Sequence, residues 1–169
     1  MGLVVADVTA EDGINVVWMD VLDVASEMGK RLTIMEISDR VVTAIVDVID
    51  EHGATSVVVE KQVPMHTKAF AAMLQLVGYC NGRKIPITVM AAVDKFKRLP
   101  QLRERYLSLG SGRSKDHKRL SERVVDEWRT MPNPPIQASP EVWQCCDSIV
   151  KKDDYSDALV QLVAAVRGA

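Results

Sequence analysis

The sequence has few aromatic residues, few cysteines and no long apolar run. Aromatic side chains make up 5% of the 169 residues. No eighteen consecutive apolar residues occur and no signal-peptide pattern is recognised, so neither a membrane span nor secretion is predicted. Cys80, Cys145 and Cys146 show no CxxC spacing, which argues against a zinc site or a disulfide framework. We therefore expect reduced thiols in an intracellular protein.

A strong net charge is also missing, but the charges are unevenly distributed. The formal net charge is −2 at pH 7, which argues against general nucleic-acid binding through overall charge. Residues 1–60 hold twelve acids and three bases, whereas residues 95–124 hold ten bases and three acids. Because phosphate binding depends on a local basic surface, the segment 95–124 is the candidate for it.

The length predicts one domain, residues 1–169, large enough to bury a core. Apolar patterning and turn signals predict strands over residues 2–9, 14–22, 55–62 and 85–92. Helical spacing predicts helices from Ser38 as N-cap to His52, and over residues 67–81, 115–129, 140–149 and 153–166. Residues 23–36 are interpreted as loop plus edge strand, and part of 97–120 as a flexible loop. The pattern indicates a mixed α/β sheet with helices on its faces.

Two acids in the last predicted helix are candidates for cation binding. Asp154 and Asp157 are three residues apart, so on a helix they share one face. Two like charges that close repel each other unless a positive charge lies between them, and a divalent cation with oxygen ligands would serve. The alternative is an ordinary first helical turn with capping acids and a solvated face.

A third acid ends the predicted strand that contains three consecutive valines, Val57 to Val59. These valines indicate a strand buried on both faces, and Glu60 follows them directly. The carboxyl ends of strands in α/β sheets are where ligands usually bind. The alternative is that Glu60 marks the point where the strand reaches water, paired with Lys61.

Three motifs together resemble the RuvC-like Holliday junction resolvases, and most closely their mitochondrial and poxvirus branch. The first is an apolar strand that ends in Glu-x-Gln, here Glu60 and Gln62. The second is a basic run that opens a helix, here residues 115–119. The third is Lys-x-Asp-Asp-x-x-Asp-Ala, here Lys151 or Lys152 with Asp153, Asp154, Asp157 and Ala158. The resemblance spans nearly the whole chain, and the last motif is the most specific.

The resemblance implies an RNase H-like fold, a five-stranded mixed sheet flanked by helices, and metal-dependent hydrolysis of four-way DNA junctions. Glu60, Asp154 and Asp157 would bind Mg²⁺ or Mn²⁺, and Lys152 would contact the scissile phosphate or form a salt link to the acids. The implied DNA contacts are Gln62, Arg113, Lys115, Lys118 and Arg119. A junction has near two-fold symmetry, so a homodimer is implied. The resemblance points to a mitochondrion or a viral replication site.

One departure concerns the family's first strand and its catalytic aspartate, which we expect to be missing. The opening residues resemble the family's second strand, so Met1 is interpreted as an internal methionine of a longer product. The loss would remove a central strand and one metal ligand. The alternative is that Leu3 to Asp7 form the first strand and that Asp7 is the acid. The rival functions are a non-catalytic nucleic-acid-binding derivative, another RNase H-like nuclease, and an unrelated α/β domain.

Overall fold

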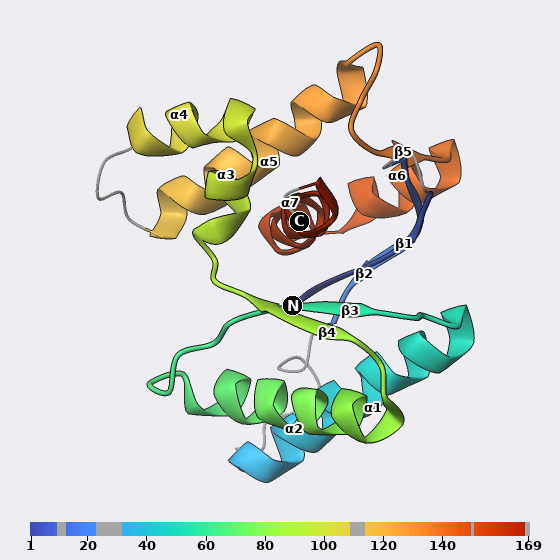
Figure 1. Ribbon diagram of the computed structural model, residues 1–169, viewed down its shortest axis with the longest axis vertical. Helices are drawn as coiled ribbons and strands as arrows, with labels where there is room; N and C mark the ends of the chain where they lie inside the picture. Colours follow the sequence, from blue (N-terminus) through green and yellow to red (C-terminus); the bar gives the residue numbers. More distant parts are fainter. Residues whose placement is uncertain (10–12, 23–31, 109–113, 150, 168–169) are drawn as a thin grey trace. The chain divides into compact units, whose positions relative to one another are not determined.

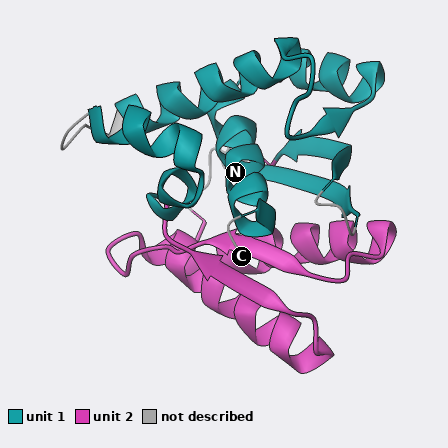
Figure 2. Ribbon diagram, turned by 45° about the horizontal axis from the view of Figure 1, so that its top comes forward, with its two compact units in different colours: residues 1–21, 93–169 teal, residues 22–92 magenta. Residues whose placement is uncertain are grey.

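The computed structural model describes the chain except residues 10–12, 23–31, 109–113, 150 and 168–169. The described elements follow in the order β1, β2, α1, β3, α2, β4, α3, α4, α5, β5, α6, α7 (Figure 1). The chain divides into two compact units, which Figure 2 distinguishes by colour: unit 1 is residues 1–21 with 93–169, and unit 2 is residues 22–92. In the described residues, no helix has the length and apolar character that a membrane crossing needs.

Unit 1 contains a three-stranded sheet in the order β1-β2-β5. Strand β1 (Gly2–Val8) pairs antiparallel with β2 (Ile14–Val21), and β5 (Gln137–Ala138) pairs parallel with β2. The register skips Val17, because Val5 pairs with Trp18 whereas Ala6 pairs with Val16. A bulge reverses the alternation of faces. It therefore explains why the buried side chains of β2 are Ile14, Val16 and Met19 rather than an unbroken alternating set.

Five helices are described in the rest of unit 1. They are α3 (Asp94–Arg98), α4 (Pro100–Ser108), α5 (Ser114–Thr130), α6 (Pro140–Ser148) and α7 (Lys152–Arg167). Helix α7 contacts α3, α5, α6, β1 and β2, and its residues Leu159, Val160 and Val163 are fully buried. The predicted inward residues of α5 are also buried, namely Leu120, Val124, Val125 and Trp128. The core of unit 1 therefore forms around α7.

The described residues of unit 2 form two helices and two short parallel strands. Helices α1 (Ile34–His52) and α2 (Thr67–Arg83) pack against each other, while β3 (Val57–Glu60) pairs with β4 (Ile87–Met90). Helix α1 ends at Gly53, which has a φ of 60° and donates its N–H to the carbonyl of Ile49. A left-handed C-terminal residue is the usual place for glycine.

Several predicted boundaries are wrong. Helix α1 begins earlier than expected, because Thr33 and Glu36 form a capping box there. Ser38 is therefore not an N-cap; it is buried inside the helix and donates a hydrogen bond to Gln75. The edge strand predicted within 23–36 is contradicted at residues 34–36, which are helical, while 23–31 lie outside the described residues. The valines of β3 are half-buried rather than fully buried.

The predicted α/β class, a mixed sheet arrangement flanked by helices, is confirmed. The described strands form two sheets, β1-β2-β5 and β3-β4, and no described strand joins them. The single-domain prediction for residues 1–169 stays a prediction.

Candidate functional site

The acidic cluster opens helix α7. Asp153 and Asp154 lie in the first turn of this helix, and Asp157 follows one turn later. Carboxylates are favoured at this end of a helix because the unpaired N–H groups there carry partial positive charge. All three side chains are partly exposed. The predicted helix start is thereby confirmed, and it brings Asp154 and Asp157 onto neighbouring turns.

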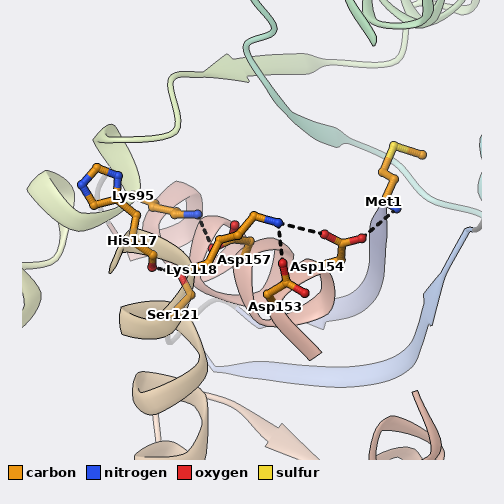
Figure 3. A network of polar contacts seen from close by, with 8 residues as sticks. All are labelled: Met1, Lys95, His117, Lys118, Ser121, Asp153, Asp154 and Asp157. Carbon is orange, nitrogen blue, oxygen red and sulfur yellow. Dashed lines mark hydrogen bonds and ion pairs between the residues drawn. The ribbon is translucent and has the colours of Figure 1, made fainter. Parts of the chain in front are cut away.

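Strand β1 meets the same end of α7. A Cβ atom built on Gly2 would lie 2.1 Å from the carbonyl oxygen of Asp154, so only a glycine allows this approach. The α-amino group of Met1 lies 3.1 Å from Oδ2 of Asp154 (Figure 3). Asp7 is exposed and five residues further along β1, roughly 17 Å away at the usual rise per strand residue. Asp7 is therefore at the other end of β1 from the acidic cluster.

Two lysines face the acids from other helices. Nζ of Lys95, in α3, lies 2.6 Å from Oδ1 of Asp157 (Figure 3). Lys118, in α5, pairs with Asp153 and lies 3.6 Å from Oδ1 of Asp154. The Lys95 side chain is only 3% exposed, whereas that of Lys118 is 42% exposed. The cluster of three acids is thus compensated by lysines that differ in access to water.

The pairing of Lys118 with Asp153 changes the pKa of both groups. The hydrogen bond from Lys118 to Asp153 and the neighbouring carboxylates raise the pKa of the ammonium group, and partial burial opposes this. Burial alone would raise the pKa of Asp153, but the hydrogen bond and charge of Lys118 outweigh it, so the pKa of this carboxyl lies below its usual value. Both groups are therefore held in their charged forms.

An aromatic cluster connects the helices that carry the two lysines. Phe96, next to Lys95, stacks on Tyr106 with ring centroids 5.4 Å apart. Tyr106 in turn lies 5.1 Å from the ring of His117, the residue before Lys118. Because Phe96 is fully buried, the cluster fixes α3, α4 and α5 against one another. Both lysines are next to a ring of this cluster.

Glu60 and Gln62 lie together in unit 2. Nε2 of Gln62 donates to the Glu60 carboxylate at 3.4 Å and to its carbonyl oxygen at 3.3 Å. The N–H of Lys61 bonds to the carbonyl of Met90 at 2.7 Å, which continues the β3–β4 pairing past Glu60. Glu60 is half-buried at the strand end, as its sequence position predicted. The proximity of Glu60 to Asp154 and Asp157, which belong to unit 1, stays a prediction.

The remaining residues that the sequence predicted for the site are Lys152, Arg119, Arg113 and Lys115. Lys152 and Arg119 are exposed, at the first residue of α7 and on α5. Arg113 lies outside the described residues, and only the backbone of Lys115 is described. Lys95 is one of the ten bases that the sequence analysis assigned to the phosphate-binding segment 95–124, but it is buried and pairs with Asp157 instead. One signal for this was present: Lys95 lies four residues before Leu99, so helical spacing places it on an apolar face.

The donor atoms suit a hard divalent cation, but their number in unit 1 is small. Carboxylate oxygens are the ligands that Mg²⁺ and Mn²⁺ prefer. Among the residues with described positions, no group of three or more His, Cys, Asp or Glu side chains is arranged to hold a metal ion. A cation at Asp154 and Asp157 would need a further ligand and would displace the lysine contacts of these carboxylates.

Comparison with known proteins gives a similarity of fold and none of sequence. No family model matches the sequence, and no curated protein matches it. Among solved structures, the chain is similar to the crystal structure of the yeast mitochondrial Holliday junction resolvase Ydc2. The TM-score is 0.65 and the sequence identity 11%, over 98% of this chain and 73% of that chain. At this identity the similarity shows a resolvase-like fold.

Proposed function

We propose that this protein is a structure-specific endonuclease that resolves four-way DNA junctions by metal-dependent hydrolysis. The observation that carries the proposal is the pair Asp154 and Asp157, presented on adjacent turns at the start of α7 in a chain with a resolvase-like fold. Phosphodiester hydrolysis by this route needs several carboxylates from different elements. Glu60, at the end of β3, is the proposed partner acid.

The proposed roles follow from the chemistry of each side chain. Glu60, Asp154 and Asp157 would hold Mg²⁺ or Mn²⁺ through carboxylate oxygens. When bound, the cation supplies an activated water and charge relief for the departing 3′ oxygen. Gln62 would orient the Glu60 carboxylate, to which it already donates, and reach toward DNA. Lys152, exposed at the start of α7, would contact the scissile phosphate.

Affinity for DNA would come from the basic segment. We propose that Arg113, Lys115, Lys118 and Arg119 contact backbone phosphates, which position the DNA without reading its sequence. Replacing the exposed Arg119 with Ala should weaken binding to all junction sequences and reduce the salt slope by about one. A homodimer would place two such sites on the two strands to be cut. The proposed setting is a mitochondrion or a viral replication site.

The test is cleavage of a labelled synthetic four-way junction with Mg²⁺ or Mn²⁺. Matched linear duplex and RNA–DNA hybrid serve as substrate controls, and Asp157→Asn serves as the protein control. Paired symmetric nicks in the junction alone, lost in the variant, would support the proposal. Preferential cleavage of the hybrid would instead indicate another nuclease of the same fold. Cleavage that Asp157→Asn leaves unchanged would exclude the proposed site.

A second candidate is a non-catalytic protein that binds branched DNA. The compensation of Asp153, Asp154 and Asp157 by lysine ammonium groups favours it, because such a site is balanced without a cation. This candidate predicts that the protein binds the four-way DNA junction tightly in EDTA and cleaves it with neither Mg²⁺ nor Mn²⁺. Binding by fluorescence anisotropy, measured beside the cleavage assay, distinguishes the two functions.

A further inference from the structure

We propose that Lys95 and a divalent cation compete for the Asp157 carboxylate, and that the Lys95 ammonium group holds this carboxylate whenever no cation is bound. The inference rests on the proposed function, because that function requires a bound divalent cation. Its subject is a residue outside the predicted site. The test of this inference uses neither DNA nor cleavage, so the inference and the proposed function can fail separately.

The argument begins with the burial of Lys95. Its side chain is 3% exposed, and its Nζ atom lies 2.6 Å from Oδ1 of Asp157. A buried ammonium group needs a partner to offset its lost hydration. Asp157 is the acidic partner that the described residues provide, and the ring of Phe96 lies 5.2 Å from Nζ. The buried ammonium group of Lys95 therefore depends on the Asp157 carboxylate as its counter-charge.

Lys118 is more exposed to water than Lys95. Its side chain is 42% exposed, so its ammonium group can leave Asp153 and Asp154 for water at little cost. The Lys95 ammonium group has no such access. A cation that approaches the acidic face meets one lysine that can move away and one that holds its carboxylate in place. The Lys95 contact, rather than that of Lys118, should therefore limit cation affinity.

Removing the Lys95 charge should have two linked effects. The partly buried Asp157, 22% exposed, would lose its counter-charge and the protein would become less stable without metal. The same carboxylate would then be free to bind a cation, and binding to the native state would restore stability. Loss of stability in EDTA and gain of cation affinity should appear together in the same variant.

The experiment compares the wild-type chain of residues 1–169 with Lys95→Met and Lys95→Gln. Mn²⁺ binding is measured by calorimetry and by the electron spin resonance of free Mn²⁺, and thermal unfolding is followed in EDTA and in Mn²⁺. Lys97→Met is the matched control, because Lys97 is an exposed lysine of the same helix. The double variant Lys95→Met with Asp157→Asn removes both charges of the pair.

We expect the Lys95 variants to bind Mn²⁺ at least tenfold more tightly than the wild type, and to gain more thermal stability from it. A variant that folds only with Mn²⁺ would support the proposal equally. Lys97→Met should resemble the wild type, and the double variant should lose the gain in affinity. Three results would overturn the proposal: wild-type affinity in both Lys95 variants, an equal gain in Lys97→Met, or failure of both Lys95 variants to fold even with Mn²⁺.

Discussion

Gly2 packs directly against the start of α7, and this position leaves no room for a side chain. The Cβ atom of an alanine would meet the Asp154 carbonyl oxygen at 2.1 Å. Overpacking of this kind costs about 1–3 kcal/mol. Gly2→Ala should therefore lower the free energy of unfolding, measured by urea denaturation.

A second glycine provides the control. Gly78 lies inside α2, and a Cβ atom there would meet nothing within 4 Å. Alanine is favoured over glycine inside a helix by about 1 kcal/mol, so Gly78→Ala should stabilise the protein. Effects of the same sign in the two variants would contradict the packing of β1 on α7.

The Lys118–Asp153 pair should make stability depend on pH at both extremes. The pKa of Asp153 is lowered in the folded state, so its contribution is present above the unfolded pKa of about 4 and is lost as pH falls through the folded value. The pKa of Lys118 is raised, so its contribution is present below about pH 10.4 and is lost as pH rises through the folded value.

Lys118→Met removes both dependences. We expect the difference in unfolding free energy between wild type and variant to be constant near neutral pH and to shrink below about pH 4. Urea denaturation across this acidic range measures it. A difference that does not change with pH would mean that the pair does not form.

Between elements, α5 and α6 are joined by a bidentate ion pair. Arg129 contacts both carboxylate oxygens of Asp147, at 2.7 and 2.9 Å, and lies over the ring of Trp143. Asp147 is half exposed, so water screens the pair. A double-mutant cycle with Arg129→Met and Asp147→Asn should give a coupling of about 0.2–1 kcal/mol. A coupling above about 2 kcal/mol would contradict the exposed geometry.

Most elements were predictable, because their apolar spacing is regular. The boundaries and elements that the sequence did not predict correctly have local causes. Ser38 has the side chain of an N-cap, but the capping box of Thr33 and Glu36 starts α1 one turn earlier. Strand β5 has two residues, too few for any periodic signal. The acids of α7 were recognised from their spacing. Lys95 as the partner of Asp157 was not, because α3 and α7 meet only through tertiary packing.

For the whole molecule, the prediction of a single domain can be tested by unfolding. Within its described residues, unit 2 has a sheet of two four-residue strands, and so small a sheet is marginal as an independent structure. We therefore expect one cooperative transition in circular dichroism and tryptophan fluorescence. Two separated transitions would show that the compact units fold independently.

The proposed function requires that Glu60 and Asp157, which are far apart in the sequence, act in one reaction. The most direct test is cleavage of a four-way junction by Glu60→Gln, Asp157→Asn and the double variant, with junction binding measured in parallel. Residues that act as a unit have non-additive effects on rate. We predict that each single variant loses cleavage but still binds, and that the double variant is no worse than either. Wild-type cleavage by Glu60→Gln would contradict the shared site.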